Sequence, residues 1–334
     1  MHDDRGSGMV NGSPLRIGVL GCAEIARRRM LPAFAACPAT EVVAVASRDG
    51  DKARETARPY GCRAVTGYQA LLADPDVDAV YVPLPAALHA RWTRAALEAG
   101  KHVLAEKPVA LEPARTAELF ALAGRRGLAL MENVMFVHHP QHEAVRKLAA
   151  DGSLGELRSL HAEFTVPRRP ADDIRYRGDL GGGALWDTGV YPLRAALHLL
   201  GPELTLLAAH LSDPGGIGVP SAGTALLVHT PTSTAVTLGF GLDHAYRSAY
   251  TLTGSRSALT LTHAFTPPAA HVPRLLPEAE PLEPADQVAL AVAAFARAAA
   301  RGRSFAADTT VRQSELLAQI AGTPPAGHRS RRDR

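Results

Sequence analysis

Apolar and polar positions alternate in two different ways along the chain. Up to about residue 136, short β-branched runs are separated by longer stretches with helical periodicity. Strands that alternate with helices in this way are typical of a parallel, doubly wound sheet. We expect these strands at residues 15–21, 41–49, 77–85, 101–106 and 128–136.

After about residue 150, strand-like runs follow each other closely and are separated by Gly, Pro, Ser and Asp, a pattern that favours a largely antiparallel sheet. Helical stretches interrupt it at residues 184–201 and at about 284–301. The predicted fold class is α/β, with an N-terminal Rossmann-type doubly wound parallel sheet and a C-terminal α+β domain. We predict a disordered tail at 1–14, a dinucleotide-binding domain at 15–137, a substrate-binding and oligomerisation domain at 138–321, and a second disordered tail at 322–334.

Composition constrains partners and location. The 334 residues are 46% hydrophobic and 21% charged, with a formal net charge of +3, which is ordinary for a globular protein. Acidic residues are spread among the basic ones, so we expect no nucleic-acid partner. The chain holds no apolar run of about 18 residues, so we expect no membrane span. Three scattered cysteines, which we expect to be buried, fit a reducing cytoplasm: Cys22, Cys37 and Cys62.

The end of the first predicted strand carries small residues, at Gly21, Ala23 and Ala26. A dinucleotide fingerprint needs small residues there for a tight turn, for close approach of a pyrophosphate and for helix packing. A plain turn between strand and helix is the alternative. We assign the following residues to cofactor binding: Gly21, Cys22, Ala23, Glu24 and Ile25.

The second predicted strand ends in Ser47 and Arg48. NAD-selective sites place an acidic residue at this tip, whereas a 2′-phosphate favours a hydroxyl donor and an arginine. Asp49 comes one residue late and is expected to cap the next helix, where Lys52 could add charge. We therefore predict NADP(H) as the cofactor; an exposed turn with an incidental arginine is the alternative.

Two further strand tips carry candidate chemistry. The segment that follows residue 82 contains Leu84, Pro85 and His89, and the next strand ends at Glu106 and Lys107. Loops at these tips border the crevice where a nicotinamide rests in such sheets, so we assign all five residues to the cofactor site. The alternatives are a structural histidine and a solvated loop lysine. Only four lysines occur among 36 basic residues, which makes each one informative.

The segment "GGGALWDTGVYPL" begins at residue 181. Its glycines permit close approach of a ligand, and Asp187 and Tyr191 are four residues apart and share one helix face. A carboxylate favoured by the helix dipole and a half-buried tyrosine are the alternative. The histidines of "FVHHPQH" lack the ligand pattern of a zinc site, so we expect no metal. The predicted substrate-binding residues are Asn133, His138, His139, Arg168, Arg175, Arg177, Gly183 and Trp186.

Together, "AEKP", the small-residue fingerprint and "GGGALWDTG" resemble the Gfo/Idh/MocA family of NAD(P)-dependent oxidoreductases. The resemblance implies homo-oligomers and hydride transfer between nicotinamide and a sugar or cyclitol carbon. It implies that Lys107 lies beside the reacting carbon and that Asp187 lines the pocket. Tyr191 stands where the common family pattern has a catalytic histidine, and Val137 where many members have arginine. These departures are similar to the dTDP-sugar 3-ketoreductases of deoxysugar pathways in antibiotic-producing bacteria.

The resulting hypothesis is NADPH-dependent reduction at C3 of a dTDP-linked keto-deoxyhexose. Lys107 would polarise the carbonyl, Tyr191 would supply the proton and Asp187 would hold the sugar or the tyrosine. Two alternatives stay open: a dehydrogenase of a free sugar, cyclitol or dihydrodiol, and a non-catalytic NADP(H)-binding sensor. We expect a homodimer or homotetramer formed through the C-terminal sheet.

Overall fold

A computed structural model describes residues 12–273, 275–276 and 282–323. Most of the two predicted tails, 1–14 and 322–334, lies outside the described residues. The chain divides into two compact units. The first contains the residues up to His142 with Pro267–His271 and Glu283–Ser314, and the second contains Glu143–Thr266 with later segments. Each unit is described by itself.

The first unit is built on a six-stranded sheet with the order β3-β2-β1-β4-β5-β6. Every strand pair in it is parallel, which confirms the predicted doubly wound sheet. The central strands are apolar because helices cover both faces, and β4 is buried at all four positions. The strands are β1 (Leu15–Leu20), β2 (Thr40–Ser47), β3 (Arg63–Thr66), β4 (Ala79–Val82), β5 (His102–Ala105) and β6 (Leu130–Glu132).

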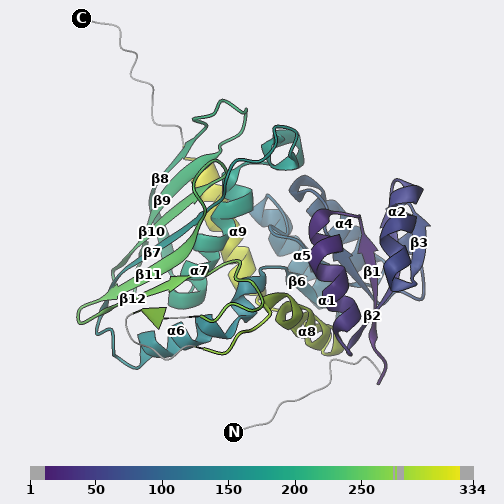
Figure 1. Ribbon diagram of the computed structural model, residues 1–334, viewed down its shortest axis with the longest axis horizontal. Helices are drawn as coiled ribbons and strands as arrows, with labels where there is room; N and C mark the ends of the chain where they lie inside the picture. The colour runs from purple at the N-terminus through teal and green to yellow at the C-terminus, as the bar shows by residue number, and fades with distance from the viewer. Residues whose placement is uncertain (1–11, 274, 277–281, 324–334) are drawn as a thin grey trace, which may run out of the picture. The chain divides into compact units, whose positions relative to one another are not determined.

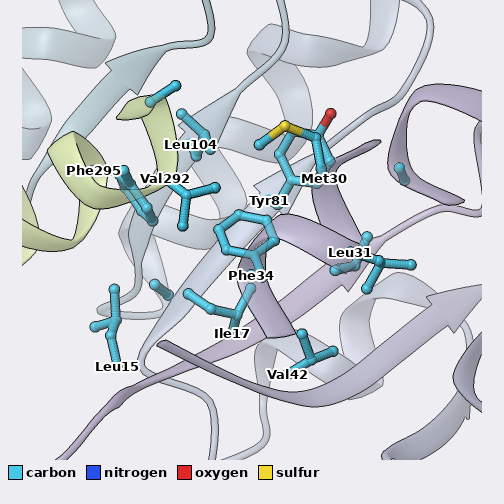
Figure 2. Packing of buried hydrophobic residues seen from close by; sticks show 14 of the residues in the cluster. Leu15, Ile17, Met30, Leu31, Phe34, Val42, Tyr81, Leu104, Val292 and Phe295 are labelled. Carbon is cyan, nitrogen blue, oxygen red and sulfur yellow. The ribbon is translucent and has the colours of Figure 1, made fainter. Parts of the chain in front are cut away.

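Helices separate these strands, and one later helix joins their core. Phe34 of α1 meets Tyr81 of β4 edge to face, with ring centroids 5.8 Å apart. Val292 and Phe295 of α8 pack into the same cluster (Figure 2). The helices of this region are α1 (Leu31–Ala36), α2 (Gly50–Ala57), α3 (Tyr68–Leu72), α4 (Ala86–Glu98), α5 (Pro113–Arg125) and α8 (Gln287–Ala300).

The second unit contains a seven-stranded sheet with the order β13-β12-β11-β7-β10-β9-β8. Only the pair of β7 and β10 is parallel among its described strands, so the sheet is largely antiparallel, as predicted. The strands are β7 (Leu157–Thr165), β8 (Leu204–Ser212), β9 (Ala222–His229), β10 (Thr234–Gly241), β11 (Arg247–Gly254), β12 (Ala258–Thr262) and β13 (Leu275–Leu276).

Helix α7 (Val190–Leu200) lies against one face of this sheet (Figure 1). A π-helical turn, Leu185–Gly189, leads into it. Gly189 belongs at this contact because an added Cβ would lie 3.2 Å from the Phe240 ring of β10. The remaining helices are α6 (Pro140–Ala150) and α9 (Ala307–Ala321).

Two sequence expectations need correction. The run at 128–136 forms only the three-residue strand β6, because a 3₁₀ turn begins at Met135. The three cysteines are free but half-buried, not fully buried. Among the described residues, no helix combines the length and the apolar character that a membrane crossing needs.

Candidate active site

The carboxyl edge of the parallel sheet gathers the predicted cofactor residues. The strand order reverses between β1 and β4, which is where dinucleotides bind in sheets of this type. Gly21 follows β1 with a φ of +119°, and an added Cβ would lie 3.0 Å from a methyl carbon of Leu84. Glycine is needed here on both counts, and Gly21 brings the β1 and β4 loops together. Cys22, Ala23, Glu24 and Ile25 continue from it into the π-helical turn Ala26–Met30.

The tip of β2 presents a guanidinium and no carboxylate. Ser47 is buried and its hydroxyl accepts a hydrogen bond from the Asp49 amide at 3.1 Å. Asp49 caps α2 by accepting from the amides of Asp51 and Lys52, which confirms the predicted cap. Arg48 is exposed and lies close enough to Tyr68 to act on the pKa of its phenol, and the exposed Lys52 lies in the first turn of α2.

Tyr68, in α3, was not predicted from the sequence. Its hydroxyl lies 3.8 Å from the position that a Gly21 Cβ would take, and its ring meets Trp92 edge to face at 4.9 Å. Burial raises the pKa of the Tyr68 phenol, and Arg48 opposes the change. The tyrosine therefore connects the fingerprint glycine to the arginine at the β2 tip. This arrangement fits the 2′-phosphate of NADP(H), which favours arginine and hydroxyl donors.

The segment after β5 carries the candidate lysine. Glu106 is buried, and its Oε1 accepts hydrogen bonds of 2.7 Å from both the Tyr81 hydroxyl and the Asn133 amide. Lys107 follows, half-buried, and its peptide bond to Pro108 is cis. Asn133, a predicted substrate residue, is thus buried and hydrogen-bonded to Glu106.

A second buried carboxylate fixes the backbone just beyond the lysine. Glu132 Oε1 accepts a hydrogen bond of 3.1 Å from the Val109 amide. Gln313 of α9, which is fully buried, donates to Glu132 Oε2 at 3.0 Å. These two residues were also missed. The available signal was a glutamate and a glutamine inside otherwise apolar, buried patterns, because such groups are retained only with hydrogen-bond partners.

His89 lies in the first turn of α4 and is 1% exposed. Its Nδ1 is 2.7 Å from the Pro108 carbonyl oxygen, and its Nε2 is 2.5 Å from that of Leu84. Burial lowers the pKa of His89, and the two carbonyls and Glu106 oppose this effect. The histidine therefore joins the β4–α4 loop to the β5–α5 loop.

In the second unit, Asp187 is half-buried and paired with Arg175. Arg175 Nε donates to Asp187 Oδ2 at 2.8 Å, and Nη1 donates to Asp173 Oδ1 at 3.1 Å. Burial lowers the pKa of the Arg175 guanidinium, but the two carboxylates outweigh it and raise the pKa above its ordinary value. One arginine therefore bridges two carboxylates, and Asp173 was not predicted as a member of this group.

The glycine run is shaped by the protein's own backbone. A Cβ added at Gly182 would lie 2.5 Å from the Arg175 carbonyl oxygen, so no side chain fits there. The Gly183 amide donates to the same oxygen at 2.8 Å. The Ala184 amide donates to the Pro220 carbonyl oxygen at 2.7 Å, which joins the β8–β9 loop to the glycine run. At Gly182, the space that was predicted for a ligand is occupied by the backbone of residues 175–177. Trp186 follows, half-buried.

Tyr191 is the second residue of α7, and its ring packs between aromatic neighbours. Its centroid is 4.8 Å from that of Phe164 and 5.9 Å from that of Phe265. The side chain is half-buried. Packing on β7 and on the segment after β12 fixes the orientation of the ring, which a useful proton donor requires.

The other predicted substrate residues are scattered. Arg168 is exposed, with a 3.4 Å contact to Asp243, and Arg177 is exposed and paired with Asp179 at 2.6 Å. The His138 ring lies beside that of Phe305, tilted by 42°, with ring centroids 4.9 Å apart. His139 is buried, its Nδ1 accepts from the Gln141 amide at 3.2 Å, and burial lowers its pKa.

Family models match both halves of the chain. The model described as "Oxidoreductase family, NAD-binding Rossmann fold" covers residues 15–134, and the model of the GFO/IDH/MocA C-terminal domain covers residues 142–260. The chain belongs to the GFO/IDH/MocA oxidoreductase family. The resemblance inferred from "AEKP" and "GGGALWDTG" is thereby confirmed.

Four curated relatives share one name. A dTDP-3,4-didehydro-2,6-dideoxy-alpha-D-glucose 3-reductase from Streptomyces violaceoruber is 54% identical over 91% of this chain and 93% of its own. A protein with the same name from Actinomadura kijaniata is 47% identical over 92% and 95%. The crystal structure of KijD10, a 3-ketoreductase from Actinomadura kijaniata, with NADP and TDP-benzene superposes with a TM-score of 0.88 at 46% identity, covering 92% of this chain and 97% of that one.

Proposed function

We propose that this protein is an NADPH-dependent reductase that acts on the C3 keto group of a dTDP-linked keto-deoxyhexose. The observation that carries the proposal is its similarity, over nine-tenths of its length, to enzymes named for that reaction. The Arg48–Tyr68 pair and the missing carboxylate at the β2 tip support NADPH as the cofactor. Deoxysugar biosynthesis, including that of antibiotics, is the proposed setting.

The roles of the side chains follow from their chemistry. NADPH supplies the hydride when it is bound. Gly21 and its neighbours hold the pyrophosphate, and Arg48 binds the 2′-phosphate. The Lys107 ammonium polarises the keto oxygen, and Tyr191 gives the proton that completes the alcohol. A free tyrosine phenol has a pKa of about 10, so it carries its proton at neutral pH.

Asp187 has a positioning role in this scheme. Its carboxylate accepts from Arg175 at 2.8 Å, and such a pair favours the ionised acid. An ionised carboxylate can accept hydrogen bonds from sugar hydroxyls but has no proton to give. Asp187 therefore orients the sugar, and proton donation falls to Tyr191.

Among the arginines predicted for the substrate, Arg168 is the best candidate for the diphosphate. Arg175 is engaged with two carboxylates and Arg177 with one at 2.6 Å. Arg168 is exposed, and its contact with Asp243 is longer, at 3.4 Å. A guanidinium held this loosely can turn to phosphate oxygens, which bind arginine bidentately.

The decisive assay follows NADPH oxidation with dTDP-3,4-didehydro-2,6-dideoxyglucose as substrate. We expect turnover, inhibition by free dTDP and a product reduced at C3. Tight NADPH binding without turnover of this or any keto-sugar would instead identify a non-catalytic sensor.

One second function has a specific observation in its favour. A D-xylose 1-dehydrogenase (NADP(+)) from Haloferax volcanii is 39% identical over 66% of this chain. Oxidation of free sugars with NADP, insensitive to added dTDP, would support that function over the proposed one.

We also propose a homodimer or homotetramer formed through the seven-stranded sheet. Leu207 of β8 is 58% exposed and Leu226 of β9 is 41% exposed, so two paired strands both present large apolar side chains to solvent. Light scattering should give a mass that is a multiple of the chain's, and Leu207→Glu should lower it. A monomeric wild-type protein would contradict this proposal.

A further inference from the structure

Two consecutive residues at the end of β6, Glu132 and Asn133, contact the chain on both sides of Lys107. Glu132 Oε1 accepts a hydrogen bond of 3.1 Å from the Val109 amide, two residues after the lysine. The Asn133 side-chain nitrogen donates to Glu106 Oε1 at 2.7 Å, directly before the lysine. Residues 106–109 are therefore held at both ends by one dipeptide.

The parallel sheet holds this part of the chain only as far as the lysine. Strand β5 ends at Ala105, and the next amide, that of Glu106, donates to the Val82 carbonyl of β4 at 3.2 Å. The Val109 amide instead donates to a side-chain carboxylate. The position of Lys107 therefore depends on side-chain contacts as well as on the strand that precedes it.

Both contacts are anchored in the core. Gln313 of α9 is fully buried, and its side-chain nitrogen donates to the two Glu132 oxygens at 3.3 and 3.0 Å. Glu106 Oε1 also accepts from the hydroxyl of Tyr81, which is fully buried, at 2.7 Å. Buried polar networks whose members are paired are rigid. The two carboxylates therefore give the loop fixed points of attachment.

Asn133 is a predicted substrate residue, but neither of its polar atoms is presented to a ligand. The residue is 1% exposed. Its nitrogen donates to Glu106 and lies 3.6 Å from Met30 Sδ. Its Oδ1 is shielded from solvent and has no hydrogen-bond partner among the described residues. An unpartnered buried oxygen costs stability, so the bond made by the nitrogen is the physical reason for an asparagine here.

We propose that Glu132 and Asn133 are positioning residues that form a clamp on both sides of Lys107 and hold its ammonium where the reaction needs it. The catalytic part rests on the proposed function. A displacement of about 1 Å in a catalytic group costs up to about 100-fold in rate, so loss of either contact lowers kcat. The two residues act through residues 106–109, so the affinity for NADPH is retained.

Hydrogen exchange of the Val109 amide in the free protein tests the clamp itself. Glu132→Leu removes the acceptor of this amide, so its exchange should become faster by about tenfold or more. Glu132→Gln keeps an oxygen acceptor and should keep the exchange rate within about threefold of wild type. Equal exchange in Glu132→Leu and wild type would overturn the proposal. The measurement needs no substrate, so its result does not depend on the proposed function.

The positioning role is tested by the kinetics of keto-sugar reduction. Glu132→Leu and Asn133→Leu should each lower kcat by about 10- to 100-fold, while the Kd for NADPH stays within about twofold of wild type. Glu132→Gln should recover most of the rate, because its oxygen can still accept from the backbone amide. Asn133→Leu also removes the unpartnered oxygen, which limits its loss of stability and separates a loss of rate from unfolding.

Lys101→Met is the matched control at the opposite end of β5. Lys101 is 9% exposed, and its ammonium donates to the Asp74 and Val77 carbonyls at 2.8 and 2.7 Å. This variant loses two hydrogen bonds of a buried side chain but should keep the wild-type kcat. A kcat within about twofold of wild type for Glu132→Leu or Asn133→Leu would overturn the proposal. An equal loss of rate in Lys101→Met or in Glu132→Gln would overturn it as well.

Discussion

Replacing Arg175 by glutamine removes the cation that Asp173 and Asp187 share. Arg175 Nε donates to Asp187 at 2.8 Å and Nη1 donates to Asp173 at 3.1 Å. The side chains of Arg175, Asp173 and Asp187 are 32%, 16% and 22% exposed, so water screens them only in part. Without the guanidinium, the two partly buried carboxylates lose the cation that they share, and Asp173 keeps a longer contact with Arg169, at 4.0 Å.

The size of the effect follows from these contacts. Hydrogen bonds to charged groups contribute about 1.5 to 3 kcal/mol each, whereas fully exposed ion pairs contribute about 0 to 1 kcal/mol. With two such bonds and partial exposure, we expect Arg175→Gln to lower the free energy of unfolding by about 2 kcal/mol. For a unit of this size that corresponds to a fall in Tm of about 4 to 8 °C.

Arg177→Gln is the matched control, two residues further along the same loop. Arg177 pairs with Asp179, but the two side chains are 58% and 62% exposed. Calorimetry or thermal unfolding followed by circular dichroism should therefore show a clear drop for Arg175→Gln and none that is resolved for Arg177→Gln. Equal changes in the two variants would refute the argument from burial and shared carboxylates. Arg175→Lys should recover only part of the loss, because an ammonium cannot match the planar fork of the guanidinium.

Four further predictions concern the cofactor, the chemistry and pH. Arg48→Ala should reduce the preference for NADPH over NADH, measured as the ratio of kcat/KM values, by about tenfold or more. One or two charge-assisted hydrogen bonds contribute about that much. An unchanged ratio would exclude Arg48 as a ligand of the 2′-phosphate. Lys107→Ala should lower kcat by orders of magnitude while NADPH still binds in calorimetry, and normal turnover would leave the lysine a loop charge. Tyr191→Phe should keep the fold, since its ring contacts with neighbouring aromatics remain, and lose about 10²- to 10⁴-fold in rate; a loss under about tenfold would point to another proton donor. Burial, aided by nearby arginines, lowers the pKa of His198 to about 4, so the folded state resists its protonation. Urea unfolding should therefore show the free energy of unfolding falling by up to about 3 kcal/mol as the pH drops from about 6.5 to 4. His198→Leu should reduce this pH dependence.

Local patterns were sufficient to predict the two kinds of sheet. The buried parallel strands appear as apolar runs, and the antiparallel ones as short segments between turn residues, because each periodicity follows from which faces are covered. The cap by Asp49 was equally predictable, since a side-chain acceptor just before a helix meets amides two and three residues on. The end of the strand before Met135 was not predictable, because a 3₁₀ turn there interrupts an apolar run that periodicity alone would continue as strand.

The sequence by itself determined the fold class, the family and the candidates that are marked by rare residues at strand ends, Lys107 above all. Only the tertiary structure decided what holds these candidates. Glu132 meets Gln313 across 181 positions of chain, and Val292 and Phe295 of α8 enter a core whose strands begin at Leu15. Contacts so distant in sequence leave no local periodicity. The physical reason is that a buried polar group must find a partner somewhere, and which partner it finds is set by how the chain packs.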